Sequence, residues 1–267
     1  MGIVYAVVNQ KGGVGKTTTA VSVAASLALA GQRVLVVDLD PQGNATSGLG
    51  VDKNAVGAGN GATSSIYDVL IDDAPIGSAI ARTPVTGLDL VPTNLDLAGA
   101  EIELMPRLSR ENCLRRALAP VRDGFDFVLI DTPPSLGLLT VNALVAADSG
   151  LVPIQCEYYA LEGVSQLLKT VDLVRRHLNP TFAVRLVVLT MYDSRARLSQ
   201  QVVAEVRQAF GDRVSPTLVP RNVRLSEAPS HGLPIALYDS RSRGARAYRA
   251  IAEEMLRDGK AWAGEGA

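Results

Sequence analysis

The feature that most constrains this chain is a glycine-rich loop that joins an apolar run directly to a helix-forming stretch. The apolar run covers residues 3–8, and residues 9–18 read Asn-Gln-Lys-Gly-Gly-Val-Gly-Lys-Thr-Thr. The loop ends as a phosphate-binding loop does, G-x-x-x-x-G-K-[ST], but Gln10 stands where that pattern has its first glycine. A second lysine, Lys11, lies at the start of the loop. We therefore predict a strand, a phosphate-binding loop and a helix as one unit.

The rest of the chain repeats the alternation of strand-like and helix-like segments. Continuous apolar runs, typical of parallel strands covered on both faces, occupy residues 34–38, 88–91, 125–131, 150–154 and 183–190, with a weaker run at 214–219. Helical patterns occupy residues 16–30, 110–122, 138–147, 162–178, 198–210 and 244–256. This order predicts an α/β fold with a doubly wound, mostly parallel sheet flanked by helices.

The length of 267 residues, of which 47% are hydrophobic, suits one domain over residues 1–267. The Gly-, Ala- and Ser-rich stretch at 54–65 predicts a flexible surface loop, and we predict a disordered tail at 258–267. No basic segment precedes an apolar one at the N-terminus, so we expect a cytoplasmic protein without a membrane partner.

The charge is unevenly distributed along the chain. Residues 1–168 hold 10 basic and 17 acidic side chains, whereas residues 169–249 hold 14 basic and 6 acidic ones. A net charge of −1 excludes a globally basic nucleic-acid binder but not a local basic face. The asymmetry favours one surface that meets a polyanion.

The loop residues have distinct expected roles toward a nucleotide. Gly12, Gly13, Val14 and Gly15 would bring the backbone close to phosphate oxygens, because glycine has no Cβ to clash. Lys16 would bridge the β- and γ-phosphates, and the Thr17 hydroxyl would be a ligand of Mg²⁺. Thr18 continues the helix N-terminus and would donate to the α-phosphate.

Acidic residues follow two of the predicted strands. Asp38 and Asp40 leave the end of the second strand, and Asp131 ends the apolar run at 127–131 in the manner of a Walker B strand. Asp40 would orient the attacking water and contribute to the metal site, and Asp131 would hold Mg²⁺. Asp38 would either lie near the metal or only cap the following turn. Residues 132–137, with two prolines and a glycine, suit a γ-phosphate sensor.

These stretches together resemble the ParA/Soj family of partitioning ATPases, in the deviant Walker A group of P-loop NTPases. The resemblance extends from residue 3 to about residue 248 and is closest to the chromosomal Soj branch. The matching stretches are residues 9–19, 37–50 (VDLDPQGNATSGLG), 97–104 (LAGAEIEL), 131–143 (DTPPSLGLLTVNA), 155–168 (QCEYYALEGVSQLL) and 220–234 (PRNVRLSEAPSHGLP).

The resemblance implies an ATPase that uses ATP, ADP and Mg²⁺. It assigns Lys11 to the phosphates of a partner subunit, so that ATP lies between two copies of a homodimer. The alternative for Lys11 is a solvated lysine beside its own nucleotide. The resemblance also places the adenine near Met191, Pro220 and Asn222; the alternative is that Pro220 and Asn222 only shape their loop.

The resemblance further implies that Arg195, Arg197 and Arg224 bind double-stranded DNA of the nucleoid without sequence preference. The alternative is a solvated face of internal ion pairs. A ParB-like partner is expected to stimulate an intrinsically slow hydrolysis. This function would be chromosome or plasmid segregation.

Three rival interpretations remain from the residues. A MinD-like positioning ATPase would need a basic amphipathic C-terminal helix that binds membrane, but residues 253–262 are mixed and acidic. A redox ATPase like the nitrogenase iron protein would need cysteines that residues 131–140 lack. A scaffold or transcriptional role without catalysis is distinguished only by activity measurements.

Overall fold

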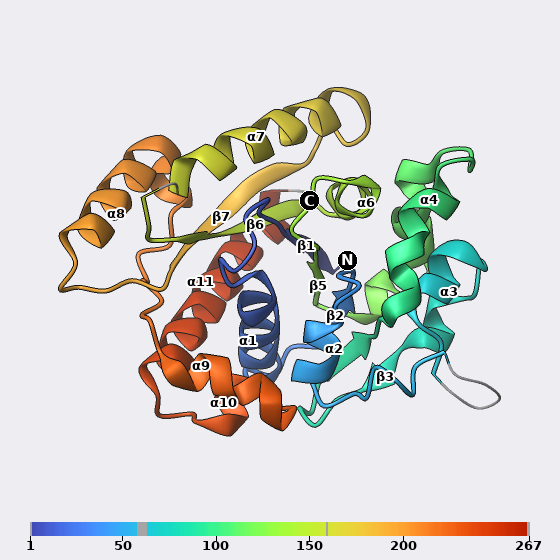
Figure 1. Cartoon of the computed structure of the whole chain (residues 1–267), viewed down its shortest axis with the longest axis horizontal. Coiled ribbons are helices and arrows are strands. Elements are labelled where there is room, and N and C mark those ends of the chain that lie inside the picture. The colour runs from blue at the N-terminus through green and yellow to red at the C-terminus, as the bar shows by residue number, and fades with distance from the viewer. Residues whose placement is uncertain (1, 58–62, 159, 266–267) are drawn as a thin grey trace.

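The computed structural model describes residues 2–57, 63–158 and 160–265, and seven strands in this part form one sheet (Figure 1). Their order across the sheet is β3-β4-β2-β5-β1-β6-β7. The strands are β1 (Ile3–Val7), β2 (Val34–Asp38), β3 (Ala81–Arg82), β4 (Leu88–Val91), β5 (Phe127–Asp131), β6 (Ser149–Gln155) and β7 (Ala183–Thr190). Every neighbouring pair is parallel except β3 and β4, which confirms the predicted doubly wound, mostly parallel sheet.

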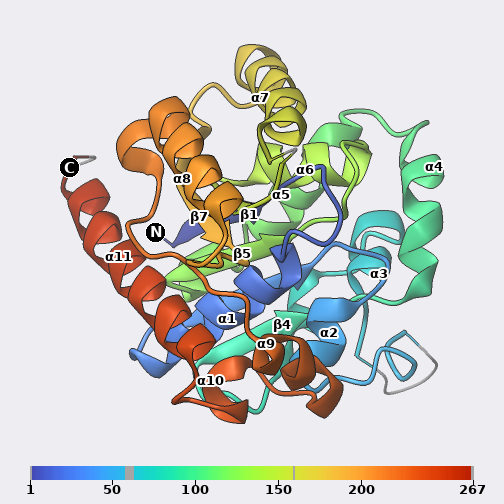
Figure 2. The same cartoon turned by 60° about the vertical axis from the view of Figure 1, so that its left-hand side comes forward.

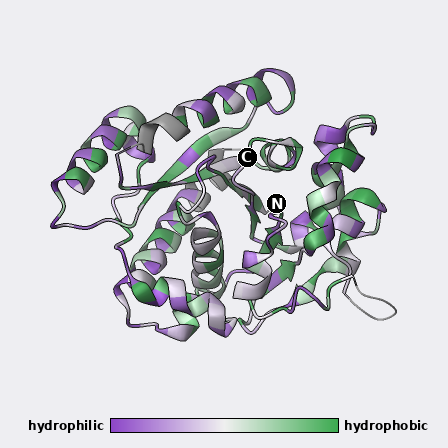
Figure 3. Ribbon diagram, viewed as in Figure 1, coloured by the Kyte–Doolittle hydropathy of each residue, from purple (hydrophilic) through white to green (hydrophobic). Residues whose placement is uncertain are grey.

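Helices cover both faces of this sheet. They are α1 (Lys16–Leu29), α2 (Asn44–Gly48), α3 (Ile66–Ile71), α4 (Ala100–Leu104), α5 (Cys113–Leu118), α6 (Leu138–Ala146), α7 (Ala160–His177), α8 (Arg197–Phe210), α9 (Val223–Glu227), α10 (Ile235–Tyr238) and α11 (Arg243–Glu265). One face of the sheet shares a core with α3 and α5–α8, and the other shares a core with α1, α10 and α11. Figure 2 shows α11 alongside α1, and Figure 3 shows hydrophobic residues along most of the strands.

Two strand predictions were wrong. Residues 214–219 form no strand; Val214 makes a single bridge to Val187 of β7, and Pro220, just beyond this segment, makes another to Tyr192. Pro216 and Pro220 cannot donate backbone hydrogen bonds, so this segment cannot complete a ladder beside β7. Conversely, β3 was not predicted, because its two residues are too few to give an apolar pattern.

Several helix boundaries also differ. The helix predicted at 110–122 is broken: α5 covers only Cys113–Leu118, between the 3-10 turns Arg110–Asn112 and Arg122–Gly124. Helix α11 continues to Glu265, so its predicted end at residue 256 was too early, and the tail predicted to be disordered from residue 258 is helical as far as residue 265. Residues 266–267 lie outside the described residues.

The predicted surface loop at 54–65 is described only at its two ends, since residues 58–62 lie outside the described residues. The backbone N–H of Gly57 donates to the carbonyl of Thr63 at 3.0 Å. Val56 is buried, and Ser65 caps α3 through a reciprocal hydrogen-bond pair with Asp68. Both ends of the loop are therefore fixed, and flexibility at its centre stays a prediction.

The fold places the functional residues at one edge of the sheet. In the register of the strands Val7 of β1 lies beside Asp131 of β5, which in turn lies beside Asp38 of β2. Since all three strands run parallel, the loops that leave their carboxyl ends meet at this edge, where open α/β sheets bind ligands.

Candidate nucleotide-binding site

The phosphate-binding loop lies at the carboxyl end of β1, and two glycines set its turns. Gly13 has φ +76° and Gly15 has φ +89°, a region that residues with a Cβ rarely adopt. Val14 between them is buried, and its carbonyl oxygen accepts a hydrogen bond of 2.8 Å from the hydroxyl of Thr190 in β7. A contact to a strand two positions away in the sheet therefore holds the loop in shape.

Lys16 is the first residue of α1, and its side chain folds back into the loop. It is 7% exposed, and its Nζ donates to the carbonyl oxygen of Lys11 at 3.3 Å. Burial lowers the pKa of Lys16, and the carboxylates of Asp131 and Asp40 oppose that shift. Within the described residues, the only hydrogen bond of this buried ammonium group is a long one to a neutral carbonyl. An anionic phosphate in the loop would therefore stabilise its charge.

Asp131 is fully buried at the end of β5. Among the described residues, none gives either carboxylate oxygen a hydrogen bond of normal geometry. Burial and then the charge of Asp38 raise the pKa of Asp131 well above its ordinary value, against the nearby Thr17 hydroxyl and the charge of Lys16. A buried carboxylate without a partner beside a threonine hydroxyl fits a hydrated divalent cation.

A complete protein cage for that cation is absent from the described residues, where no three His, Cys, Asp or Glu side chains gather to hold a metal. Mg²⁺ is commonly held by one or two protein groups together with phosphate oxygens and water. The pair Thr17 and Asp131 fits that incomplete arrangement.

Asp38 does not face an open metal position. Its Oδ2 accepts bonds of 2.7 Å from both the backbone N–H and the hydroxyl of Thr46, and its Oδ1 accepts from the N–H of Asp40 at 3.3 Å. Burial raises the pKa of Asp38 to about 6 despite these bonds. Asp38 thus fixes the turn that leads into α2, in agreement with the capping alternative for this residue.

Asp40 follows in the same turn and is nearly buried. Its Oδ1 accepts a hydrogen bond of 3.0 Å from the backbone N–H of Gln42. The charge of Asp40 acts on the ionisation of both Lys16 and Asp131, so the three groups share one electrostatic site. The structure therefore brings Lys16, Asp40 and Asp131 together, although 115 residues separate the first from the last.

Residues 132–137 pack against the phosphate-binding loop. The hydroxyl of Thr132 donates to the carbonyl oxygen of Val7 at 2.8 Å. A Cβ built on Gly12 would have the Cβ of Pro134 as its nearest neighbour, at 3.9 Å. The two loops therefore lie next to each other, and a change in one could be transmitted to the other over a short distance.

Lys11 is turned toward its own chain. Its backbone N–H donates to Asn9 Oδ1 at 3.0 Å, and its ammonium group forms an ion pair with Glu157, which follows β6. About one third of each of the two side chains is exposed. The role of Lys11 toward a partner subunit stays a prediction, and this ion pair would have to open for it.

The three residues predicted to surround the base lie on neighbouring loops. Met191 follows β7 in a left-handed conformation, with φ +53°. The backbone N–H of Arg221 donates to the carbonyl of Tyr192 at 3.2 Å, which ties the loop of Pro220 and Asn222 to Met191. Asn222 also caps the first turn of α9, so it shapes its loop whatever it does toward a base.

The predicted DNA-binding arginines lie on the surface. The Arg195 side chain is 89% exposed and pairs with Asp193, and Arg224 pairs with Glu227 at 2.9 Å. Arg197 is exposed at the first position of α8. Such exposed pairs hold little energy, so these arginines could exchange their carboxylates for phosphates.

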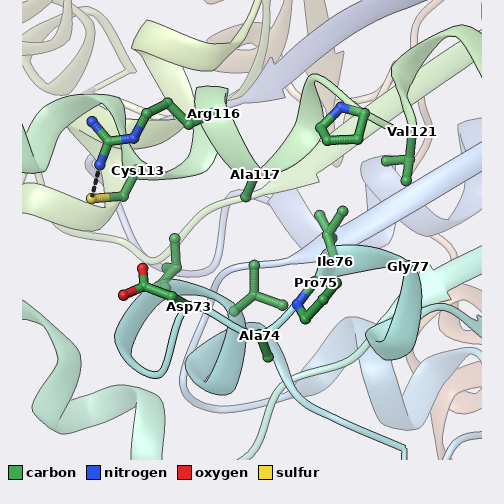
Figure 4. Close-up of a pocket in the computed structure, with 12 residues that line it drawn as sticks. Asp73, Ala74, Pro75, Ile76, Gly77, Cys113, Arg116, Ala117 and Val121 are labelled. Atoms are coloured by element: carbon green, nitrogen blue, oxygen red, sulfur yellow. Dashed lines mark hydrogen bonds between the residues drawn. The ribbon is translucent and has the colours of Figure 1, made fainter.

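A hollow in the described part of the chain lies away from this site. Its volume is about 440 Å³, and Figure 4 shows it between the 73–77 segment and α5, with Arg116 and Cys113 at one side. A second hollow, of about 240 Å³, touches Thr17 and Thr18 and separates α1 from the segment after α9. Residues 9–16 of the phosphate-binding loop line neither of these two hollows.

Sequence reasoning missed several residues that shape the site. They are Asn9, Thr46, Glu101 and Glu157. Each acts through a hydrogen bond or ion pair to a residue distant in sequence or across a turn. All four lie inside the stretches that carry the family resemblance. Their position in those stretches was the one sequence feature that could have pointed to them.

No helix in the described residues is long and apolar enough to cross a membrane.

Comparisons with known proteins identify relatives of this chain. Residues 2–184 match the family model described as an AAA domain. The chain is 56% identical over 259 residues to the sporulation initiation inhibitor protein Soj of Bacillus subtilis, with 97% of this chain and 100% of that protein covered. It is 52% identical over 257 residues to the chromosome partitioning protein ParA of Myxococcus xanthus, with 96% and 89% covered.

Solved structures share the fold. A Mycobacterium smegmatis protein described as cobyrinic acid a,c-diamide synthase with bound ADP and magnesium has a TM-score of 0.84 and 42% identity, with 97% of this chain and 96% of that one covered. The cell division ATPase MinD of Pyrococcus furiosus has a TM-score of 0.77 and 25% identity, with 96% and 99% covered. By its matches to Soj and ParA proteins over nearly its whole length, the chain belongs to the Soj/ParA family of chromosome-partitioning ATPases.

Proposed function

We propose that this chain is an ATP-dependent switch in chromosome or plasmid segregation, whose ATP-bound homodimer binds DNA without sequence preference. The observation that carries the proposal is the charge arrangement of the phosphate site. A buried Lys16 ammonium lies in the same electrostatic site as the Asp131 carboxylate, to which no described residue donates a hydrogen bond of normal geometry. An anion and a cation together, as in MgATP, would satisfy both.

The binding roles follow from the positions of the residues. The backbone of residues 12–15 and the N-terminus of α1 would surround the phosphates, with Lys16 on the β- and γ-phosphates and Thr18 near the α-phosphate. Thr17 and Asp131, with Asp40 nearby, would hold Mg²⁺, which supplies charge neutralisation to the phosphates. The relative from Mycobacterium smegmatis, described with ADP and magnesium, supports this ligand.

For hydrolysis, Asp40 would accept the proton of a water or hold that water in line with the γ-phosphate. Residues 132–137 would respond to the presence of that phosphate, because Thr132 is bonded to Val7 at the end of β1 and Pro134 lies beside Gly12 of the phosphate-binding loop. We expect slow intrinsic turnover, because the described site offers lysines and carboxylates, and a ParB-like partner would complete it.

Dimerisation would depend on Lys11. The γ-phosphate adds negative charge that a second lysine from the partner subunit can neutralise, so ATP favours the dimer over the monomer. In the single chain Glu157 holds Lys11 by an ion pair. Formation of the dimer would exchange this carboxylate for a phosphate.

The dimer would present two copies of the arginine face formed by Arg195, Arg197 and Arg224. Doubling the number of phosphate contacts raises affinity steeply and makes it dependent on salt. A protein of net charge −1 could then bind the nucleoid, and we expect it there in the cytoplasm.

Size-exclusion chromatography with light scattering tests the proposal, with ATP and Mg²⁺, with ADP and Mg²⁺, and without nucleotide, each with and without duplex DNA. We expect a dimer only with ATP, and co-elution with DNA only for that dimer. A monomer under every condition, or DNA binding that ignores the nucleotide, would contradict the switch.

A further inference from the structure

We propose that Glu101 is a positioning residue for ATP turnover, which caps the start of α6 from α4 and thereby holds residues 132–137 against the phosphate-binding loop. The inference rests on the proposed function, because it deepens the role of residues 132–137 as the γ-phosphate sensor. Glu101 would act through this segment and not by contact with ATP.

Helix α6 has no capping side chain at its own N-cap position. That position is Gly137, whose backbone is extended, with φ −76° and ψ −169°. An N-cap residue normally adopts this conformation, and its side-chain oxygen accepts a hydrogen bond from the backbone N–H of the second or third helical residue. Glycine has no such oxygen, so the acceptor for these N–H groups has to come from another part of the chain.

Glu101 supplies this acceptor from α4, which Figure 1 shows beside α6. Its Oε1 accepts a hydrogen bond of 3.3 Å from the backbone N–H of Leu139, the second residue of α6. This is the bond that the side chain of an N-cap residue would accept. The carboxylate also lies at the positive end of the helix dipole, which stabilises its negative charge.

The missing side chain of Gly137 makes room for this carboxylate. A Cβ built on Gly137 would overlap both carboxylate oxygens of Glu101, and its three nearest atoms all belong to that carboxylate. The carboxylate therefore occupies the space in which a side chain of residue 137 would begin. Because the φ of Gly137 is one that any residue adopts, glycine is required here for space and not for its backbone freedom.

The first turn of α6 is also bonded to the segment before it. The hydroxyl of Thr140, next to the capped Leu139, donates to the carbonyl oxygen of Ser135 at 2.6 Å. Leu139 and Thr140 are both buried, so this turn is packed as well as bonded. A cap that fixes this turn therefore also fixes Ser135.

Pro134, just before the anchored Ser135, lies beside the phosphate-binding loop. Its Cβ is 3.9 Å from a Cβ built on Gly12. The beginning of the segment has an anchor of its own, because Thr132 is bonded to the end of β1. Loss of the Glu101 cap would thus release the segment after Thr132 and leave the phosphate-binding loop in place.

The expected consequence is a loss of turnover without a loss of nucleotide binding. The loop backbone and Lys16 would bind phosphates whether or not residues 132–137 are held, so the affinity for ADP should not depend on Glu101. The response to the third phosphate should depend on it, since a small displacement of a positioning segment lowers turnover steeply.

Glu101→Ala tests this role in the full chain with ATP and Mg²⁺. Phosphate release should show kcat lowered roughly tenfold, with KM changed by less than about twofold. Calorimetry should give the wild-type affinity for ADP and a smaller preference for a nonhydrolysable ATP analogue over ADP. Glu101→Gln keeps an acceptor oxygen at the same place, so it should restore most of the turnover.

Ser242→Ala is the matched control, because it removes the cap of a helix on the opposite face of the sheet from α6. Ser242 precedes α11, and its hydroxyl oxygen accepts a hydrogen bond of 3.1 Å from the backbone N–H of Ala245. Both alanine variants should lower Tm by roughly 2–4 °C, as expected for the loss of one helix cap. Only Glu101→Ala should lower kcat at a temperature at which circular dichroism shows every variant to be folded.

Gly137→Ala is an independent test, because its methyl group would displace the Glu101 carboxylate without removing it. It should lower kcat about as much as Glu101→Ala does. The double variant Glu101→Ala, Gly137→Ala should lose no more than either single variant, because both changes break the same contact. Losses that multiply in the double variant would contradict the inference.

Three further results would overturn it: wild-type kcat in Glu101→Ala, an equal loss of kcat in Ser242→Ala, or no recovery in Glu101→Gln. Should Glu101→Ala fail to fold, Glu101→Asp keeps the charge on a shorter side chain, and wild-type kcat in that variant would equally overturn it. Failure of the proposed switch is separate, because it appears as a wild type that does not dimerise with ATP, whereas the turnover of each variant relative to the wild type stays measurable.

Discussion

The phosphate site and the arginine face differ in how their charges are held. Lys16, Asp38 and Asp131 are buried; the pairing of β2 with β5 places the two aspartates side by side, and Lys16 begins α1 and folds back into the phosphate-binding loop. Arg195 and Arg224 are exposed and pair with carboxylates two and three residues away in the chain, and Arg224 also lies 3.8 Å from the carboxylate of Asp239. The first arrangement depends on neighbouring strands of the sheet, whereas the second is formed mostly by residues close together in the chain.

This difference teaches what each region can do. A buried charge is costly unless a partner compensates it, so the phosphate site is rigid and demands a ligand of defined charge. Exposed ion pairs are weak and exchangeable, so the arginine face suits many DNA sequences and responds to salt. Single substitutions should therefore cause large losses of ligand binding or turnover in the phosphate site, and only moderate changes of DNA affinity in the arginine face.

The largest effect is expected from Lys16→Ala. Loss of the buried ammonium should abolish detectable ATP binding, a decrease of roughly 1,000-fold or more, because no other described cation lies as deep in the loop. Isothermal titration calorimetry measures it, with Lys169→Ala on α7 as the exposed control. Affinity close to the wild type would remove Lys16 from the phosphate site.

Asp40→Ala should separate binding from chemistry. ATP binding should persist, while turnover falls by roughly 100-fold or more, the usual contribution of a positioned general base. The variant should accumulate as an ATP-bound dimer in light scattering. Normal phosphate release by this variant would exclude Asp40 from catalysis.

The ion pair of Lys11 and Glu157 predicts opposite effects from its two partners. Lys11→Ala should weaken the ATP-dependent dimer by roughly tenfold, because the charge acting on the partner's phosphates is lost. Glu157→Gln should strengthen it, because Lys11 is then released from its own chain. Dimer dissociation constants from sedimentation decide the question, and a dimer that neither substitution changes would refute the assigned role.

Arg195→Glu and Arg224→Glu should each lower the affinity for duplex DNA by roughly tenfold and reduce its salt dependence. Dimerisation should be unchanged. Arg33→Glu is the control, since Arg33 is an exposed arginine paired with Asp126 and lies before β2, away from the ligand-binding edge. If dimerisation fails together with DNA binding, these arginines hold the fold or the interface instead.

The smallest effect is expected from Glu227→Gln. This change removes the nearer of the two carboxylates that pair with Arg224 and compete with DNA phosphates for it, so DNA affinity should rise by roughly twofold to threefold. Fluorescence anisotropy at two salt concentrations measures it. A gain as large as the losses above would mean that the surface pair is far stronger than its exposure indicates.

Most of the fold was predictable because its strands are continuous apolar runs, which locate parallel strands without knowledge of their partners. Local patterns failed where tertiary contacts decide the outcome. The residues at 214–219 looked like a strand, but Pro216 cannot donate a backbone hydrogen bond and the segment makes only an isolated bridge to β7, whereas the two residues of β3 form a strand by pairing with β4. The phosphate-binding loop, by contrast, could be predicted from the sequence, because its glycines and lysine are required by local geometry and not by tertiary contacts.

The sequence by itself determined the class of site: a glycine-rich loop with Lys16 and Thr17 at a helix start, and acids at strand ends, are patterns of neighbouring residues whose chemistry does not depend on the rest of the molecule. Only the tertiary structure decided that Asp38 fixes a turn, that Glu157 holds Lys11, and that Glu101 joins α4 to the start of α6. Those roles depend on burial and on partners far apart in the chain, and these exist only once the sheet has formed.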